Sequence, residues 1–260
     1  MNLLIVNFYK SNEPAGMKIM NHVFLVTGVV DNPYILVDAD GLTVIDTGLP
    51  HSQGKILAYV ASLGKSARDV KRIILTHSDL DHVGGLAALH KLTGARTYAS
   101  KIEADAIAAG KPSRQIKPSG FSVMRLMFSL LRPFMKATPF HVDEILTDSQ
   151  ILPTLGGLRV IETSGHTPGH ISLFAPAVGV LFCGDSLVTD ENGIHGSRSS
   201  LTWDDAKAKE AVRKQSALGA RIVCSGHGPV VMDAMGKWHN GALPPDGGER
   251  SNDVPFHPGS

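Results

Sequence analysis

The sequence predicts an α/β fold. Short apolar runs of strand length alternate with stretches of helical periodicity along most of the chain. Several of the strand-like runs end in a turn that joins a glycine to a histidine or an aspartate. Both halves of the chain repeat this order of strand, polar turn and helix, which is the pattern expected when helices pack on β-sheets.

The first half of the chain begins this alternation. Its strand-like runs are residues 24–26, 34–37, 42–45 and 72–75, and its helical stretches are residues 53–63, 82–92 and 101–109. The run 42–45 ends in Asp46-Thr47-Gly48, and the run 72–75 leads into a segment rich in Asp and His. We therefore expect polar side chains at the ends of neighbouring strands.

Residues 111–141 interrupt the alternation. The segment is apolar on nearly every face of a predicted helix, is broken at Pro133 and carries flanking basic residues. A helix that is apolar all round has to be covered. We expect either a helix packed on the domain or in a homodimer interface, or a cap over a substrate pocket. In the second case Met124, Met127 and Phe128 would form an adaptable apolar wall.

The second half resumes the alternation. Its strand-like runs are residues 151–152, 158–161, 171–174, 180–183 and 221–224, and its helical stretch is residues 204–218. Residues 241–260 are rich in Pro and Gly and are predicted to be an extension without chemistry. Residues 1–240 are thus expected to form a single domain with an insertion at about 111–141.

The composition restricts the classes of partner and the compartment. The 260 residues are 43% hydrophobic, enough for a substantial core. The net charge of +1 gives no field that would attract nucleic acid or an anionic membrane, so we expect neither as a partner. The N-terminus does not resemble a signal peptide, and no segment approaches the roughly 20 apolar residues of a membrane span. Cys183 and Cys224 lie in strand-like runs, which favours buried free thiols and a cytoplasmic protein.

One cluster of metal-ligand side chains follows directly after the run 72–75. It consists of His77, Asp79, Asp81 and His82. Alternate side chains at a strand end face one way, so the first three can converge, while His82 is predicted to open the next helix. An EF-hand is excluded because Val83 would fall where an oxygen ligand belongs. Two imidazoles with two carboxylates suit zinc, iron or manganese better than calcium.

Three further turns, at residues 164–170, 183–186 and 224–229, carry ligand-type side chains at predicted strand ends. These side chains are His166, His170, Asp185 and His227. In each turn a neighbouring glycine lets the backbone turn tightly and leaves the polar side chain exposed at the sheet edge. Such edges are where α/β sheets present functional groups. Together with the first cluster, the turns supply enough ligands for two metal ions.

The order of these motifs resembles the metallo-β-lactamase superfamily of metal-dependent hydrolases. It runs Asp-Thr-Gly, His-x-Asp-x-Asp-His-x-Gly-Gly, Gly-His-Thr-Pro-Gly-His, Gly-Asp-Ser and Gly-His-Gly, over about residues 20–231. The resemblance implies an αββα sandwich, in which two mixed β-sheets lie face to face, helices cover both outer faces and the metals lie at one edge.

The resemblance also implies a role for each side chain. His77 and His166 should bind the first of two divalent metal ions, zinc foremost, and Asp81, His82 and His227 the second, with Asp185 bridging them. Asp46 should accept a hydrogen bond from a ligand and orient it. His170 is expected to support the site rather than bind metal. His51 and His195 lie in loops within reach of a substrate, although each also fits an ordinary loop histidine.

Asp79 departs from the family pattern, which usually has histidine at this position. An anionic oxygen in place of a neutral nitrogen makes the first site harder and more negative. Asp79 could bind and favour iron or manganese over zinc. Alternatively, its shorter side chain could leave the first site weakly occupied.

The predicted activity is hydrolysis of an ester, lactone, thioester or related bond in a small molecule. A bound metal lowers the pKa of its water to about 7, which supplies a metal-bound hydroxide, and Asp81 or Asp185 would orient it and move its proton. Two alternatives stay open. One is a mononuclear iron oxidoreductase resembling persulfide dioxygenases, and the other is a non-catalytic metal-binding member of the fold.

Overall fold

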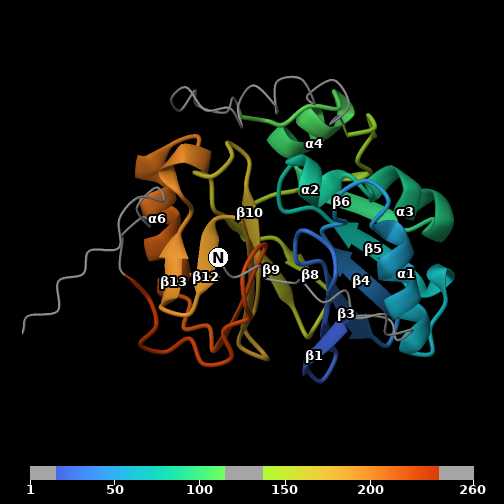
Figure 1. The fold of residues 1–260 in the computed structure, drawn as a ribbon, viewed down its shortest axis with the longest axis horizontal. Helices are drawn as coiled ribbons and strands as arrows, with labels where there is room; N and C mark the ends of the chain where they lie inside the picture. The colour runs from blue at the N-terminus through green and yellow to red at the C-terminus, as the bar shows by residue number, and fades with distance from the viewer. Residues whose placement is uncertain (1–15, 115–136, 240–260) are drawn as a thin grey trace, which may run out of the picture.

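The computed structural model describes residues 16–114 and 137–239, which form a four-layer sandwich (Figure 1). The first sheet has seven strands in the order β1-β2-β3-β4-β5-β6-β7, and the second has five in the order β14-β11-β10-β9-β8. The first sheet comprises β1 (Gly16–Met20), β2 (Val23–Val26), β3 (Tyr34–Asp38), β4 (Gly41–Ile45), β5 (Val70–Ile74), β6 (Arg96–Ser100) and β7 (Glu144–Leu146). The second comprises β8 (Ile151–Leu152), β9 (Leu158–Glu162), β10 (Ile171–Ala175), β11 (Val180–Gly184) and β14 (Ile222–Ser225). A separate hairpin of β12 (Leu187–Asp190) and β13 (Gly193–Gly196) lies beside the second sheet.

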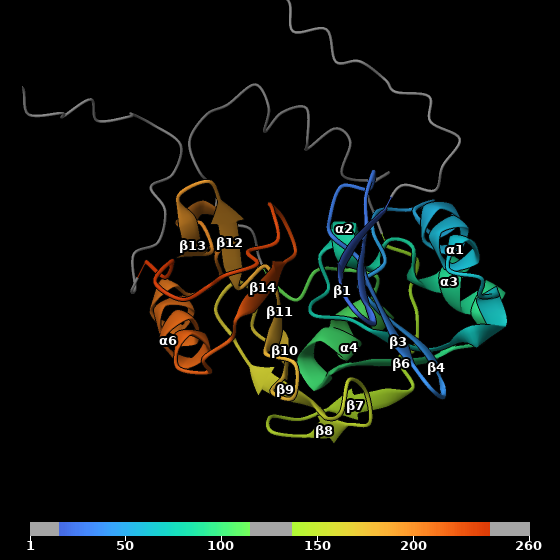
Figure 2. The same ribbon diagram turned by 90° about the horizontal axis from the view of Figure 1, so that it is seen from below.

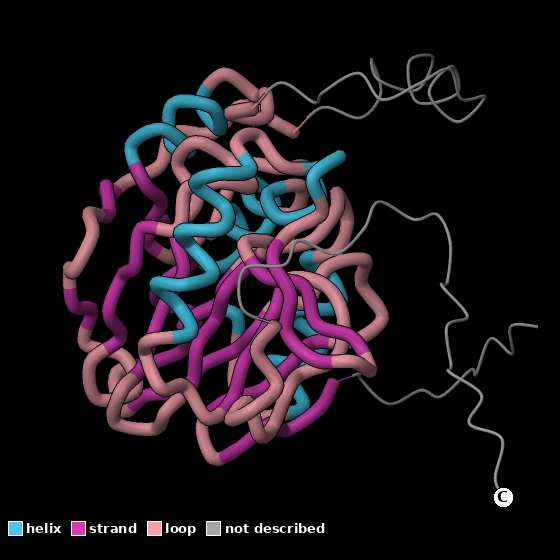
Figure 3. The backbone as a smooth tube through the Cα atoms, turned by 90° about the vertical axis from the view of Figure 1, so that its left-hand side faces the viewer, coloured by secondary structure: helices cyan, strands magenta, loops and turns pink. Residues whose placement is uncertain are grey.

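Helices cover the outer face of each sheet. Those over the first sheet are α1 (Gln53–Ser62), α3 (Leu86–Thr93) and α4 (Lys101–Ala108), with the short α2 (Leu80–Val83) before α3. The second sheet is covered by α6 (Asp205–Ser216). Figure 2 shows α6 on one side of the sheets and α1 and α3 on the other, and Figure 3 views the molecule from the α6 side. The αββα arrangement expected from the resemblance is confirmed.

Alternation of apolar side chains along the strands builds the layers. On β5, Ile74 packs between the two sheets, while the preceding Ile73 packs under the outer helices of the first sheet. On β11, Phe182 faces the space between the sheets and Leu181 faces the α6 side. Successive residues of a strand point to opposite faces, so a continuous apolar run supplies two core layers at once.

Parallel pairing brings the ligand-bearing turns to one edge. β4 pairs in parallel with β5, and β11 pairs in parallel with β14, so each pair ends at the same rim of its sheet. The Ile171 N–H donates to the carbonyl of Thr76 at 3.1 Å, which joins the rims of the two sheets. Polar side chains that follow these strands therefore meet between the sheets.

The predicted helix 82–92 is wrong at its start and at its middle. The helix begins at Leu80, two residues earlier than expected, and His82 lies inside it rather than opening it. Two separate segments, α2 and α3, flank Gly84-Gly85. A Cβ at Gly85 would lie 2.3 Å from the carbonyl oxygen of Thr47, so the glycine admits the Asp46 loop against the helix.

Other expectations have mixed outcomes. Cys183 and Cys224 are buried free thiols, as predicted. In the described part of the chain, no helix is long and apolar enough to cross a membrane. The bulk of the predicted cap or interface, including Met124, Met127 and Phe128, lies outside the described residues, as does the extension 241–260. Their roles stay predictions.

Candidate metal centre

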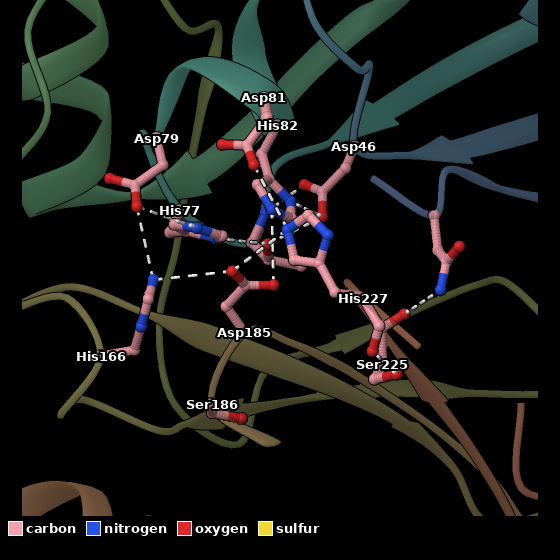
Figure 4. Close-up of polar contacts among 12 residues, drawn as sticks. Asp46, His77, Asp79, Asp81, His82, His166, Asp185, Ser186, Ser225 and His227 are labelled. Carbon is pink, nitrogen blue, oxygen red and sulfur yellow. Dashed lines mark hydrogen bonds and ion pairs between the residues drawn. The ribbon is translucent and has the colours of Figure 1, made fainter. Parts of the chain in front are cut away.

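The predicted ligands come together at the shared rim of the two sheets. The first sheet contributes four of them, from the loop after β5 and from α2: His77, Asp79, Asp81 and His82. The second sheet contributes three: His166 after β9, Asp185 after β11 and His227 after β14. Figure 4 shows these side chains pointing toward one another across the gap between the sheets. They form three overlapping groups in which the ligand atoms of each group lie within 4.8 Å of one another.

One group contains His77, Asp79 and His166. Asp79 Oδ2 lies 3.4 Å from His166 Nε2 and 3.7 Å from His77 Nε2. The aspartate side chain is therefore long enough to reach the space that the two imidazoles face. Both predicted outcomes for Asp79, a harder first site or a weakly occupied one, stay predictions.

A second group contains Asp81, His82 and His227. His227 Nε2 lies 3.3 Å from Asp81 Oδ2. Asp185 stands between the two groups: its Oδ1 lies 3.4 Å from His82 Nε2, and its Oδ2 lies 3.7 Å from His166 and 3.5 Å from His227. This is the placement that a bridging ligand requires.

The donor set fits divalent metal ions. The Nε2 atoms of His77, His82 and His166 and the Oδ1 atom of Asp185 are buried without a hydrogen-bond partner in the described part of the chain. Buried polar atoms without partners are costly, so four that face one another fit a site that binds a cation. Bonds of about 2.0–2.2 Å to a tetrahedral zinc separate neighbouring ligand atoms by roughly 3.3–3.6 Å. The separations of 3.3–3.7 Å at this site agree with that requirement.

Asp46 fixes the orientation of two of these histidines. It accepts hydrogen bonds from His82 Nδ1 at 2.9 Å and from the Thr76 hydroxyl at 2.8 Å. Because the Thr76 hydrogen is used on Asp46, the Thr76 oxygen is left to accept from His77 Nδ1 at 2.9 Å. In its neutral form each imidazole then carries its proton on Nδ1 and presents the Nε2 lone pair to the site. Asp46 adopts a φ of 58°, which its contacts with the β5 loop hold in place.

Residues 26–227 match the sequence description of the metallo-beta-lactamase superfamily. The chain belongs to the metallo-β-lactamase superfamily. It is 26% identical over 234 residues to a probable metallo-hydrolase, YflN, of Bacillus subtilis. The aligned region covers 82% of this chain and 86% of that protein.

The chain is also similar to a curated enzyme and to a solved structure. A hydroxyacylglutathione hydrolase of Cereibacter sphaeroides is 28% identical over 170 residues, or 65% of this chain and 52% of the enzyme, so the chain spans about half of that protein. A metallo-beta-lactamase family protein of Thermus thermophilus superposes with a TM-score of 0.66 at 24% identity, covering 85% of this chain and 78% of that one. The structural match supports the fold.

Electrostatics keep two carboxylates of the candidate metal centre ionised. Burial alone would raise the pKa of Asp185, but the neighbouring His82, His166 and His227 outweigh it and hold that pKa well below its usual range. For Asp79, burial is likewise outweighed, by the neighbouring His166, His77 and Arg114 side chains, so its pKa is lowered. Burial, followed by the neighbouring His82, lowers the pKa of His77 and keeps that imidazole neutral. Burial would lower the pKa of His82, but the neighbouring Asp185 and Asp46 outweigh it and raise that pKa. Ionised carboxylates and neutral imidazoles are the forms that bind metal, so metal binding at His82 would release a proton.

His170 lies behind Asp185. Its Nε2 accepts a hydrogen bond from the Asp185 backbone N–H at 3.1 Å, so its Nδ1 carries the proton and donates to Thr163 Oγ1 at 2.9 Å. Burial and the nearby His166 lower the pKa of His170 to about 3, so it stays neutral. Because its Nε2 accepts from the Asp185 backbone, His170 positions Asp185 and does not offer that nitrogen to a metal ion.

The two predicted substrate-contacting histidines are not among the converging ligand atoms. His195 pairs with Asp190 at 3.1 Å and stacks on His239, within and beside its own hairpin. His51 is exposed in the turn before α1, with a φ of 76°. Their contacts with substrate stay predictions.

Sequence analysis missed Glu103, which ties the metal-site loops together. The side chain is fully buried on α4 and accepts hydrogen bonds from Ser78 N at 2.9 Å and Gly169 N at 2.9 Å. It also accepts from the hydroxyls of Thr167 at 2.7 Å and Ser113 at 2.8 Å. Ser78 and Gly169 lie in the loops of His77 and His166, so one carboxylate fixes the spacing of the two imidazoles.

Two further residues at the site were also missed. Arg114 donates to Asp79 Oδ2 through Nη2 in a buried ion pair. Asp31, in the turn after β2, is 1% exposed and makes no hydrogen bond to another residue in the described part of the chain. The only sequence signal for Arg114 was its place among the basic residues that flank the 111–141 segment.

Proposed function

We propose that the protein is a metal-dependent hydrolase that holds two divalent ions, zinc foremost, and cleaves an ester, lactone or thioester in a small molecule. The observation that carries this proposal is the convergence of buried imidazole and carboxylate atoms from both sheets, which have no hydrogen-bond partner among the described residues. The similarity to a hydroxyacylglutathione hydrolase supports a thioester among the candidate substrates.

The ligands would divide into two sets. His77, Asp79 and His166 would hold the first ion, and Asp81, His82 and His227 the second, with Asp185 shared. Ions bound there would supply Lewis acidity, which lowers the pKa of water toward 7 and stabilises developing negative charge on a substrate oxygen.

The protein's own groups would direct substrate and protons. The side chains of Asp81 and His227 are 31% and 36% exposed, whereas those of His77 and His82 are fully buried. Substrate would therefore approach from the Asp81 and His227 side. Asp81 and Asp185 are the ionised carboxylates that would take a proton from the attacking water and pass it to the leaving group.

One observation favours a second function. His77, His166 and Asp79 form a set of two imidazoles and one carboxylate, a set that also suits mononuclear iron in oxygenases. A mononuclear iron dioxygenase that acts on thiols or persulfides is therefore the alternative. It would bind one iron per chain and consume oxygen, whereas the hydrolase would contain zinc or manganese.

The test is to replace Asp185 with Asn and assay lactones, thioesters, phosphodiesters and β-lactams. We expect turnover of the true substrate to fall at least about 100-fold, because the variant loses the shared anionic ligand. Asp148→Asn makes the same change at a partly exposed surface ion pair with Lys214 and should leave turnover unchanged. An Asp185→Asn variant with full metal content and undiminished turnover would overturn the assignment.

A further inference from the structure

Arg114 contacts Asp79, the residue of the first ligand set that departs from the family pattern. Arg114 Nη2 donates to Asp79 Oδ2, the oxygen that also faces His77 and His166. The side chains of Arg114 and Asp79 are only 6% and 15% exposed. Arg114 Nε is buried and lacks a hydrogen-bond partner in the described part of the chain, so Asp79 is the anion that this guanidinium contacts.

Arg114 is held beside the metal loop by the residue before it. The Ser113 N–H donates to Ser78 Oγ at 2.9 Å, and the Ser113 hydroxyl donates to Glu103 at 2.8 Å. Glu103 in turn accepts from Ser78 N. These contacts fix the backbone of Arg114 against the loop that carries Asp79, so the ion pair is built into the fold.

The ion pair makes the two metal positions electrostatically unequal. At the first position the charge of Asp79 is cancelled by Arg114, as if the ligand were a neutral histidine. At the second position the ion pairs of Asp81 and Asp185, in the described part of the chain, are with histidines. A guanidinium on a ligand oxygen repels a divalent ion on that same oxygen, and burial limits screening by salt.

We propose that Arg114 is a built-in countercharge that weakens metal binding at the first position, so that the protein holds one ion firmly and one exchangeably. Arg114 is a positioning residue, since it acts through Asp79. The inference rests on the proposed metal centre and adds that its second position binds metal more tightly than its first. Asp79 stands where the family usually has histidine, and its pair with Arg114 gives the first position the net charge of an all-histidine set.

The test is calorimetric titration of metal-free protein with zinc alone, comparing the wild type with Arg114→Gln and Arg114→Lys. We expect two binding events in the wild type, with the weaker one assigned to the first position by its loss in His166→Ala. Arg114→Gln should tighten that weaker event at least tenfold and leave the tighter event unchanged. Arg114→Lys keeps the positive charge and should behave like the wild type.

Controls separate a change of charge from a change of fold. Arg96→Gln removes an exposed arginine paired with Glu144, and it should leave both binding events unchanged. Arg114→Met, which keeps the apolar arm, is a second neutral variant if Arg114→Gln does not fold by circular dichroism. An unchanged or weakened first event in both neutral variants would overturn the role of Arg114. A wild type that binds no zinc at all would overturn the metal centre itself.

Discussion

Glu103 offers a sharp test of how the loops of the metal site are held. In Glu103→Gln the amide oxygen can replace Oε1, which accepts from Ser113, Thr167 and Gly169. The amide NH₂ group must then replace Oε2, which accepts from Ser78 N at 2.9 Å. Two donors would face each other in a fully buried place, and the remaining hydrogen bonds would lose their charge assistance.

The cost follows from these contacts. A hydrogen bond to a charged group contributes about 1.5–3 kcal/mol, and a buried donor left unsatisfied costs about 1–3 kcal/mol. We expect Glu103→Gln to lower the free energy of unfolding by about 3 kcal/mol, which lowers the Tm by roughly 6–12 °C in a domain of this size. Zinc affinity at the His77 and His166 position should fall as well, because Glu103 sets the spacing of their loops.

Thermal unfolding of metal-free protein, followed by zinc titration, measures both effects. Glu144→Gln is the matched control, since Glu144 forms an exposed ion pair with Arg96. Such pairs contribute about 1 kcal/mol or less. Equal unfolding temperatures for Glu103→Gln and Glu144→Gln would refute this role of Glu103.

Two further predictions concern other carboxylates at the site. Asp46→Asn turns one of the two carboxylate oxygens that accept from Thr76 and His82 into an NH₂ donor, so zinc affinity by calorimetry should fall about 10–100-fold. An unchanged affinity would refute the role of Asp46 in orienting His77 and His82. Burial is the main cause that raises the pKa of Asp31 from 3.8 to about 7. Between these two pH values the carboxyl is protonated in the folded protein and ionised in the unfolded chain. Stability from this proton is complete below about pH 4 and is lost as the pH rises through 7, by up to roughly 4 kcal/mol. In urea unfolding of metal-free protein, Asp31→Asn should therefore gain stability over the wild type between pH 4 and pH 8, and parallel pH profiles would contradict this.

The ligand residues could be predicted because each one follows an apolar strand. Asp185 and His227 come directly after the buried runs of β11 and β14, with a glycine beside each. A strand ending in such a turn presents its polar residue at the sheet edge whatever the rest of the fold does. The motif order then identified the family, and the sandwich followed from the family.

The residues that hold the ligands could not be predicted, because their partners lie far along the chain. Glu103 stands three residues after Ser100, a spacing that predicts a local helix cap. Its carboxylate instead reaches Gly169, 66 residues away. The break at Gly84-Gly85 likewise depends on the close approach of Thr47. The strand β6 was missed because its sequence, RTYAS, has too few apolar residues to stand out.

In the proposed function, hydrolysis depends on metal bound at this site. Elemental analysis of protein purified without added metal, with hydrolysis measured before and after chelation, determines both the metal content and the dependence of hydrolysis on it. We expect between one and two zinc ions per chain, loss of hydrolysis on chelation and its recovery when zinc is returned. Protein without bound divalent metal, or hydrolysis that survives chelation, would contradict the account. One iron per chain with oxygen uptake would point to the dioxygenase instead.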